Sequence, residues 1–461
     1  MSARFTRREM LNKLGWGGAG VGLLAGRGFA DADTDGDPAY AGFAKNIKLV
    51  SPTLQDGPSA YVENGKVMQP AREVPVFHTA DVVVVGGGSA GFAAAVAAAR
   101  TGAKVAMVER YGSLGGLFTN GMVLVVIGTG VKENGQFKLV TRGICEEFLR
   151  RLEKMGDGAI TKLEANVGQP TVDPEAAKVL MDEMVQEAQV DMFFHAWGVD
   201  VIQSGNAVQG VIFESKQGRQ AILAKVVVDA SGDGDVYFQA GAAYKQISHA
   251  MGFVYRIGNS DRVDAGKLPK DTKPPRLGSV EPIKSARWMN NLGPKGNGLD
   301  IRDLSRIEME HRKSAWDYVQ RIRKTPGYEE VFLMQTTPQI GVRATRLLDG
   351  VASINKKGAV SGEKCADVVA VSGHDGLKLP EFAIPYGALV PKTVDNVIAA
   401  GRCISCASDL IDRVRLIPVC VVTGHAAGVA AALAAKASAR PRDVPVAEIQ
   451  KVLREQGAYL G

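Results

Sequence analysis

The sequence predicts an α/β protein whose main domain is a parallel sheet with an antiparallel meander, interrupted by an inserted α+β domain. A run of β-branched residues leads directly into a glycine cluster and an alanine-rich helix at residues 81–100. Two alternating, strand-like segments at 206–215 and 219–230 follow one another closely, as in a meander. Residues 246–384 differ in character, with more Pro, Arg and Trp and irregular periodicity, before strand-like signals return.

The first 32 residues have the features of an export signal. Arg7-Arg8 precedes a modest apolar stretch, and small residues near Ala30 and Ala32 offer a cleavage site. The pattern resembles a twin-arginine signal, and a basic amphipathic first helix is the alternative. We therefore expect a periplasmic or otherwise exported protein that uses the twin-arginine export machinery.

The charge outside this segment is nearly balanced. The chain has a formal net charge of +6, of which the first thirty residues, with five basic residues and one acid, contribute +4. The remaining +2 gives no electrostatic case for binding nucleic acid or an anionic membrane. A composition of 46% apolar and 23% charged residues is typical of a globular protein with a sizeable core. We expect no nucleic-acid partner and no stable membrane insertion.

One βαβ unit is predicted from a strand, a glycine turn, a helix and a second strand at 81–85, 86–91, 89–100 and 104–109. Gly86 allows the tight turn, Gly88 lets a pyrophosphate approach the backbone, and Gly91 lets the helix pack closely on the strand. Glu109 ends the second strand, where a carboxylate can accept the ribose hydroxyls. A purely structural glycine turn is the alternative. The full arrangement predicts a Rossmann-type dinucleotide site.

Other signals place the remaining elements and the domain boundaries. Asp173 and Pro174 read as an N-cap and a first-turn proline, so a helix is predicted from there. The apolar segment from Ile417 is predicted to be a buried helix, because Thr, Gly and His interrupt it. Asn64-Gly65 predicts a hairpin turn. The chain then divides into a signal (1–32), an extension (33–75), the first part of the main domain (76–245), the inserted substrate or cap domain (246–384), and the second part with C-terminal helices (385–461).

Three segments far from the glycine turn favour FAD over NAD as the dinucleotide. Arg110–Gly121 supplies a second glycine pair just beyond the acid, suited to cover the pyrophosphate and flavin. Val226–Asp235 returns a strand end and a small-residue turn to the first glycine loop. Asn396–Cys403 ends a third strand before the helix near Ile417, whose N-terminus could stabilise negative charge on a reduced flavin. No second strand-bound GxGxxG appears, so no separate NAD(P)H domain is expected.

These segments, with "PQIGVRATR", "IPYGALVP" and "TGHAAGVAAALAA", span about 81–433. Together they resemble the FAD-dependent oxidoreductase family of the glutathione-reductase-like flavoprotein fold, related to fumarate reductase and the glucose-inhibited division flavoproteins. The resemblance implies a Rossmann-type FAD-binding domain with an inserted α+β substrate domain. It implies FAD contacts at Gly86, Gly88, Ser89, Gly91, Glu109, Arg110, Gly115, Gly116, Thr119, Val199, Asp229, Gly232, Asp233, Gly401 and Arg402. No histidine stands in "LGGLFT", so non-covalent FAD is expected, and His425 replaces the family's usual Gln without an evident reason.

Catalytic candidates follow from hydride transfer, which needs a substrate held over the flavin and usually a group that moves a proton. Arg343 and Arg346 in "GVRATR", and Arg413 and Arg415 in "DRVR", could clamp a carboxylate or stabilise an oxyanion, with an interdomain or pyrophosphate ion pair as the alternative. We take Arg343 and Arg413 as the candidates. His374, in a loop-like stretch, is the preferred histidine for proton transfer, with a plain surface histidine as the alternative and His249 as second choice.

Trp288 and Trp316 could shape the substrate pocket, although core packing accounts for them equally well. The five cysteines include Cys403-Ile-Ser-Cys406, which has redox-pair spacing but lies where small residues are needed. No cluster has metal-ligand spacing, so no metal is expected.

We therefore predict an exported FAD-dependent oxidoreductase that transfers a hydride between a small organic substrate and non-covalently bound FAD, with an external electron carrier or acceptor. A fumarate-reductase-like flavoprotein that reduces an activated C=C bond is the closest alternative. A tRNA-modifying flavoprotein and a non-catalytic flavin-binding partner are the alternatives of other classes.

Overall fold

The computed structural model describes residues 60–156, 158–163, 169–374 and 379–461. Contacts between residues divide the chain into two compact units, Met1–Glu73 and Val74–Gly461. The segment predicted to be an export signal, residues 1–32, lies outside the described residues.

The described part of the first unit is a β-hairpin. Strands β1 (Tyr61–Glu63) and β2 (Lys66–Met68) pair antiparallel. The turn between them consists of Asn64 and Gly65, both of which have positive φ. The hairpin predicted from the Asn-Gly pair is therefore confirmed.

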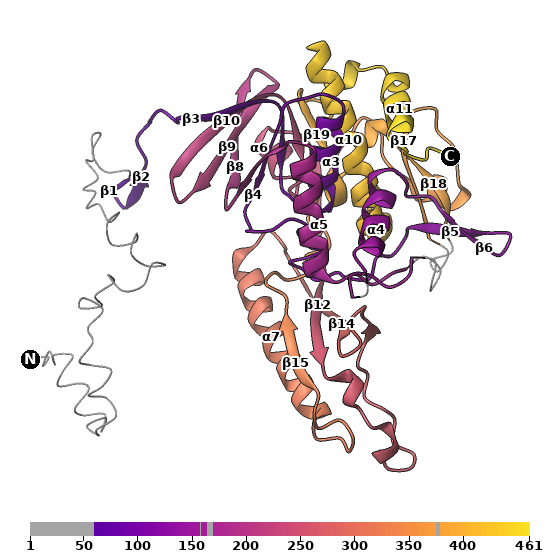
Figure 1. Ribbon diagram of the computed structural model, residues 1–461. Helices are drawn as coiled ribbons and strands as arrows, with labels where there is room; N and C mark the ends of the chain where they lie inside the picture. The colour runs from indigo at the N-terminus through magenta and orange to yellow at the C-terminus, as the bar shows by residue number, and fades with distance from the viewer. Residues whose placement is uncertain (1–59, 157, 164–168, 375–378) are drawn as a thin grey trace, which may run out of the picture. The chain divides into compact units, whose positions relative to one another are not determined.

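The second unit is built around a mixed sheet of seven described strands (Figure 1). The order is β7-β4-β3-β10-β9-β8, with β19 also paired to β10. Strands β7, β4, β3, β10 and β19 run parallel, whereas β10, β9 and β8 form an antiparallel meander. The predicted α/β class with a parallel sheet and a meander is confirmed. The strands are β3 (Val76–Val85), β4 (Val105–Glu109), β7 (Asp191–Phe194), β8 (Trp197–Ser204), β9 (Ala207–Ser215), β10 (Gly218–Asp229) and β19 (Val397–Ala399).

Strand β10 joins distant parts of the chain at one edge of the sheet. It pairs with β3 along most of its length, and its other side pairs first with β9 and then with β19. The carboxyl ends of β3, β10 and β19 therefore lie together, where the backbone N–H of Ala230 donates to Val85 O (3.0 Å) and that of Ala400 donates to Asp229 O (2.9 Å). Ligands of open α/β sheets bind at such an edge.

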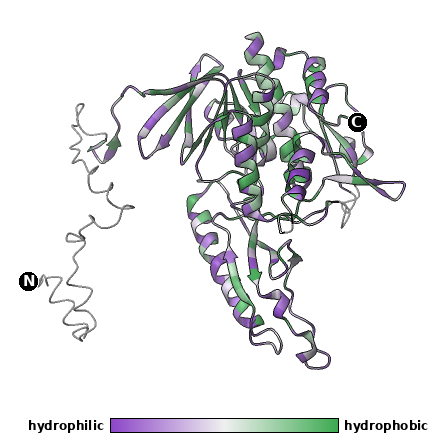
Figure 2. Ribbon diagram, in the orientation of Figure 1, coloured by the Kyte–Doolittle hydropathy of each residue, from purple (hydrophilic) through white to green (hydrophobic). Residues whose placement is uncertain are grey.

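Two helices of small residues pack together beside the sheet. Helices α3 (Ser89–Arg100) and α10 (Ile417–Ala437) are almost entirely buried. Their backbones approach so closely that a Cβ at Gly424 would lie 2.1 Å from Ala90 O. One helix of the described chain, α10, is long and apolar enough to cross a membrane, but 89% of its most apolar stretch is buried inside the protein. Figure 2 shows the apolar character of this centre against the more polar α7.

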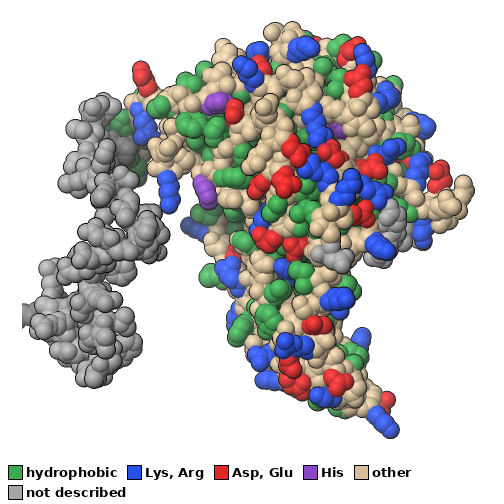
Figure 3. All heavy atoms as spheres, viewed as in Figure 1, with side chains coloured by type: hydrophobic (Ala, Val, Ile, Leu, Met, Phe, Trp, Pro, Cys, Tyr) green, Lys and Arg blue, Asp and Glu red, His purple; other side chains and the backbone are tan. Residues whose placement is uncertain are grey.

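Residues 249–336, which lie within the predicted insert, form an α+β layer with its own small core. Four strands pair antiparallel in the order β13-β14-β12-β15. One face of this sheet packs on α7 through Tyr255, Ile257, Ala315 and Val319. The outer side of α7 carries charged side chains of both signs (Figure 3). The elements are β12 (His249–Gly258), β13 (Ser279–Val280), β14 (Arg287–Gly296), α7 (Ile301–Ile322) and β15 (Phe332–Thr336).

Buried polar contacts fix this layer to the main domain. The indole N–H of Trp288 donates to Met122 O (2.6 Å). Arg256 pairs with the fully buried Glu281, with 2.9 Å between Nε and Oε2, and lies 3.5 Å from Asp173. Asp173 is the N-cap of α5 (Pro174–Glu187) and accepts from two first-turn N–H groups, as the sequence predicted.

The remaining elements complete the main domain around the sheet. Helix α11 and strand β17 both pack against α10. Strand β17 pairs with β18, and β16 pairs with β11. These elements are β5 (Gly130–Glu133), β6 (Gln136–Leu139), α4 (Ile144–Lys154), α6 (Asp235–Gln239), β11 (Tyr244–Gln246), β16 (Arg346–Leu348), α8 (Lys356–Ser361), β17 (Val368–His374), β18 (Leu379–Pro385), α9 (Ile411–Val414) and α11 (Val446–Glu455).

Candidate active site

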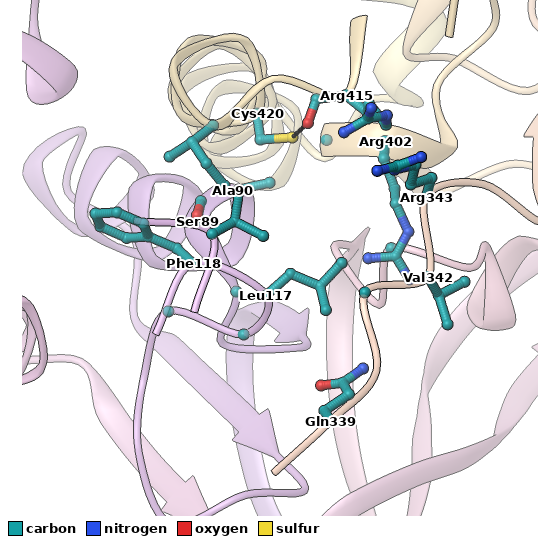
Figure 4. A pocket seen from close by; sticks show the side chains of 18 of the residues that line it. Ser89, Ala90, Leu117, Phe118, Gln339, Val342, Arg343, Arg402, Arg415 and Cys420 are labelled. Atoms are coloured by element: carbon teal, nitrogen blue, oxygen red, sulfur yellow. Dashed lines mark hydrogen bonds between the residues drawn. The ribbon is translucent and has the colours of Figure 1, made fainter. Parts of the chain in front are cut away.

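A single cleft opens where the three parallel strands end. The loops that follow β3, β10 and β19 line one wall, and residues of the insert line the other. The cleft holds about 1320 Å³ of empty space, including the part open to solvent (Figure 4). The sequence-predicted residues among its lining are Gly86, Gly88, Ser89, Glu109, Arg110, Gly115, Gly116, Gly232, Gly401, Arg402 and Arg343.

The three glycines of the first turn have different physical roles. Gly86 has φ +97°, and a Cβ there would lie 2.6 Å from Ala230 O. A Cβ at Gly91 would lie 1.7 Å from Gly86 O, so only glycine allows the helix to close on the strand. Gly88 leaves a bare backbone facing the cleft, since its added Cβ would meet nothing nearer than 4.0 Å.

The second glycine pair lies beside the first turn. The N–H of Gly115 donates to Gly87 O (2.8 Å), and a Cβ at Gly116 would lie 3.0 Å from Gly88 Cα. Two backbone segments thus approach within van der Waals distance and both border the cleft. This closeness is the physical reason for the glycines in "LGGLFT".

Two helix N-termini open into the cleft. Helix α3 begins at Ser89 and α10 at Ile417, and neither has a side-chain cap or an acidic residue in its first turn. Both termini contribute residues to the lining of the cleft. Unsatisfied N–H groups and the positive end of the helix dipole favour a negatively charged ligand at each terminus. A cofactor with a pyrophosphate and a second electron-rich group fits this pair of sites.

Glu109 lies on the cleft where the second strand ends. Its carboxylate accepts from the N–H of Gly87 (2.6 Å) and from that of Tyr111 (2.9 Å). Burial raises its pKa, and these two hydrogen bonds act in the opposite direction. The next residue, Arg110, stacks on Tyr111 with 4.8 Å from Cζ to the ring centroid. The hydrogen bonds hold the carboxylate in place for a hydroxyl donor.

Asp229 and Asp233 shape the cleft from behind its surface. Asp229 is fully buried and accepts from Ser231 N and Oγ and from the N–H groups of Val236 and Tyr237. Burial raises the pKa of Asp229 to about 6. These bonds hold the turn after β10, so the role of Asp229 is to position the loop.

Asp233 pairs with Arg402 (2.8 Å) and accepts from Thr345 Oγ1 (2.7 Å). Arg402 lines the cleft, and its buried Nε has no hydrogen-bond partner in the described chain. The ion pair holds the guanidinium of Arg402 against the turn that follows β10, so Arg402 and Asp233 position this part of the cleft.

Besides Asp229 and Asp233, three predicted cofactor contacts lie outside the lining. Gly91 is covered by the turn itself, and Thr119 donates its hydroxyl to Leu114 O. Val199 lies on β8 and borders a separate small hollow between β8 and α6.

The catalytic candidates are placed differently from one another. Arg343 lines the cleft, whereas Arg413 does not and Arg415 does. Residues two apart in a helical turn point to different sides, so one arginine of "DRVR" faces the cleft and the other does not. His374 was expected in a loop, but it lies at the buried end of β17. It does not line the cleft.

The insert supplies lining residues that the sequence analysis did not identify. It also supplies Trp288, for which the sequence analysis left both a pocket role and core packing open. Trp288, Asn290, Gln339 and Val342 reach the cleft from β14 and from the loop before β16. Trp288 is buried and lines the cleft as well. These segments are brought together by antiparallel strand pairing within the insert. No local spacing in the sequence predicts the register of that pairing.

The two cysteines with redox-pair spacing are not bonded to each other. Cys403 and Cys406 are free and buried, and burial raises the pKa of both thiols. His425 is buried in α10 and hydrogen-bonds Gln456 (2.9 Å), so it holds α10 to the end of α11. Among the described residues, no group of three His, Cys, Asp or Glu side chains could hold a metal ion.

Comparisons with known proteins agree with this geometry. A family model described as FAD dependent oxidoreductase matches residues 81–252 and 247–453. The chain is 54% identical to dihydrolipoyl dehydrogenase of Trypanosoma brucei brucei, but over 49 residues only, or 11% of this chain and 10% of that protein. The match therefore spans about a tenth of the curated relative.

Two solved structures cover most of the chain at low similarity. A geranylgeranyl bacteriochlorophyll reductase-like protein of Thermoplasma acidophilum is 17% identical, covering 82% of this chain and 83% of that one, with a TM-score of 0.43. The p-nitrophenol 4-monooxygenase of Pseudomonas putida is 14% identical, covering 82% and 84%, with a TM-score of 0.40. Because the family model covers most of the second unit, the chain belongs to the FAD dependent oxidoreductase family and is an FAD-dependent enzyme.

Proposed function

We propose that the protein is an exported oxidoreductase that transfers a hydride between a small organic substrate and non-covalently bound FAD, with an external electron carrier or acceptor. The observation that carries this proposal is the two-walled cleft. One wall consists of backbone and helix N-termini, and the other consists of side chains from the insert. FAD, when bound, supplies a two-electron acceptor and donor that the protein's own side chains do not provide.

The backbone wall would hold the cofactor. The N-terminus of α3, with Gly88 and Ser89, favours a pyrophosphate, and Glu109 is positioned to accept ribose hydroxyls. The N-terminus of α10, at Leu416 and Ile417, would stabilise negative charge on the ring system. We assign cofactor contact to the ten predicted residues of this wall that line the cleft.

The insert wall would hold the substrate and limit the access of water. Its apolar residues include Trp288, Val254 and Val342, and its polar ones include Gln339 and Arg343. An apolar wall with few polar groups fixes the orientation of a small ligand. No histidine of the described chain lines the cleft, so none is placed there to move a proton or to attach FAD covalently.

The visible spectrum of the purified protein tests this function. We expect the bands of oxidised flavin, release of that flavin by acid precipitation, and anaerobic bleaching by at least one member of a panel of alcohols, amines and hydroxy acids. Fumarate with a reduced dye is the arm that tests C=C reduction. A protein that carries flavin but is neither bleached by any donor nor reoxidised by any acceptor would contradict an oxidoreductase role.

Export is supported by Arg7-Arg8, the apolar stretch that follows and the small residues near Ala30 and Ala32. Cell fractionation of the full chain in a bacterium with twin-arginine export tests it. We expect the wild-type chain outside the inner membrane. The double variant Arg7→Lys, Arg8→Lys should remain in the cytoplasm. The same distribution for both chains would contradict a twin-arginine route.

A further inference from the structure

The insert wall contains one arginine without a compensating partner. Arg343 is half-buried and lines the cleft, and no residue of the described chain forms a hydrogen bond or ion pair with it. Burial lowers its pKa, the nearby charge of Arg415 lowers it further, and the charge of Asp412 acts in the opposite direction. A partly desolvated guanidinium is unfavourable unless a negative group meets it.

The two other arginines of this side already have carboxylate partners. Arg402 pairs with Asp233 (2.8 Å). Arg415 donates from Nε (3.0 Å) and from a terminal nitrogen (2.6 Å) to a single oxygen of Asp412. Figure 4 shows the three arginines on the same side of the pocket, across from Ser89 and Phe118. Three cations and two carboxylates leave one positive charge, at Arg343.

The surroundings of Arg343 distinguish this charge from the cofactor's phosphate site. The α3 N-terminus, where a pyrophosphate fits, is formed by Gly88 and Ser89 from the main domain. Arg343 instead belongs to the insert wall, together with the apolar side chains of Trp288, Val254 and Val342. A ligand on this wall would meet one cation and a largely apolar surface.

We propose that the insert wall binds the substrate as an organic monocarboxylate, with the carboxylate on Arg343 and an apolar body against Trp288 and Val254. The inference rests on the proposed function and specifies its substrate class. The planar guanidinium donates two parallel hydrogen bonds to a carboxylate, which fixes both position and orientation. One free charge selects a monoanion, because the second carboxylate of a dianion would meet no unpaired cation here.

Ligand binding to the FAD-loaded enzyme tests the proposal. Benzoate, 3-methylbutanoate, benzamide, phthalate and inorganic phosphate are titrated, with the change in flavin absorbance and the rise in the thermal unfolding midpoint as two readouts. We expect benzoate or 3-methylbutanoate to bind at least 10-fold more tightly than benzamide and phosphate. Phthalate is expected to bind no more tightly than benzoate.

Three variants connect the result to the residue. Arg343→Gln should weaken binding of the monocarboxylate by roughly 10- to 100-fold, since it removes a charge-assisted pair of hydrogen bonds. Arg343→Lys should keep part of the affinity, because it retains the charge but not the planar fork. The control Arg306→Gln removes an exposed arginine on α7 and should change nothing.

Several outcomes would overturn the proposal. These are equal binding of benzoate and benzamide, no binding of either monocarboxylate, equal binding of phosphate, tighter binding of phthalate, or unchanged affinity in Arg343→Gln. The amide comparison uses the wild-type enzyme, so it decides the matter even if Arg343→Gln fails to fold. A preparation without flavin bands would count against the proposed function, whereas one that keeps its flavin without a preference for monocarboxylates would count against this inference alone.

Discussion

The two walls of the cleft present different chemical groups to a ligand. On the main-domain wall, ligands would meet backbone: the glycines that follow three strand ends, and the N-termini of α3 and α10. On the insert wall they would meet side chains, among them Trp288, Gln339 and Arg343. A change of side chain therefore alters the second wall directly, whereas the glycine and helix N-terminal contacts of the first wall change only if the backbone itself moves.

This difference corresponds to the two ligands of a flavoenzyme. A cofactor that is the same in every member of a family can be held by backbone groups that tolerate no Cβ. A substrate that varies between members needs a wall that mutation can reshape. The following predictions separate the two walls by their energetics.

The largest effect is expected on the backbone wall, for Gly91→Ala. The new Cβ would lie 1.7 Å from Gly86 O, which is backbone and cannot rotate away. We expect a loss of more than about 5 kcal/mol in the free energy of unfolding, at the extreme of single substitutions, and loss of flavin. Denaturant unfolding and the flavin content of the purified variant measure it.

Gly102→Ala is the control for this change. Unlike the helical Gly91, Gly102 has positive φ (+95°), and its added Cβ would meet nothing within 4 Å. Only backbone strain of about 1–2 kcal/mol is expected, with full flavin content. A loss in Gly91→Ala as small as that in Gly102→Ala would contradict the close approach of helix and strand at this turn.

The next effect concerns the attachment of the insert wall, in Arg256→Leu. The change leaves Glu281 buried without its partner, and we expect a loss of about 4 kcal/mol in unfolding free energy. The double variant Arg256→Leu, Glu281→Leu should recover most of it, because the buried charge of Glu281 is removed too and Asp173 keeps its two N–H donors. A double variant no more stable than the single one would contradict a role for the ion pair.

A pH-dependent change in the free energy of unfolding is expected from His425, which is buried in α10, the helix whose N-terminus borders the cleft. Burial lowers the pKa of His425 to about 4 from 6.5, so the folded protein holds this residue neutral while the unfolded chain takes up a proton. The unfolded state is therefore favoured as the pH falls from about 6.5 to about 4. His425 should contribute a loss of about 3 kcal/mol between pH 7 and pH 4.

Unfolding of wild type and His425→Gln across this range isolates that contribution, since other titrating groups are common to both. We expect the wild type to lose more stability on acidification than the variant does. A constant difference between the two proteins from pH 7 to pH 4 would show that His425 is not buried as a neutral group.

The smallest effect is expected for Trp288→Phe on the insert wall. The variant removes the indole N–H that donates to Met122 O, and we expect a loss of about 1 kcal/mol in unfolding free energy with flavin content unchanged. Trp316→Phe, at an exposed tryptophan of α7, should stay within about 0.5 kcal/mol of wild type. Equal stability of the two variants would remove the Trp288–Met122 contact as an anchor of the insert.

The sequence predicted the backbone wall well because that wall is locally encoded. The strand, glycine turn, helix and Glu109 all lie within thirty residues, and helix starts at Pro174 and Ile417 carry their own proline signals. The "NVIAAGRC" segment predicted the strand β19, and its parallel pairing with β10 places it at the same edge of the sheet.

The insert wall could be predicted only in part. Arg343 was found from its motif, but Arg415 faces the cleft in place of Arg413, and His374 is buried in β17. The direction in which a side chain points from a one-turn helix such as α9 depends on how that helix packs. The amino-acid sequence of the helix alone does not predict this. Gln339 and Asn290 are brought together by pairings between segments of the insert, and no sequence period records this.

The most direct test of the central claim, that backbone at the glycine turn holds FAD in this cleft, is the visible spectrum of Gly88→Asp beside that of Gly88→Asn. The position has room for a side chain, since its Cβ would meet nothing nearer than 4.0 Å, so both variants should fold. We predict flavin bands in the wild type, their loss in the aspartate variant, whose charge repels a pyrophosphate, and a smaller reduction in the asparagine variant. Full flavin occupancy in folded Gly88→Asp would contradict the account.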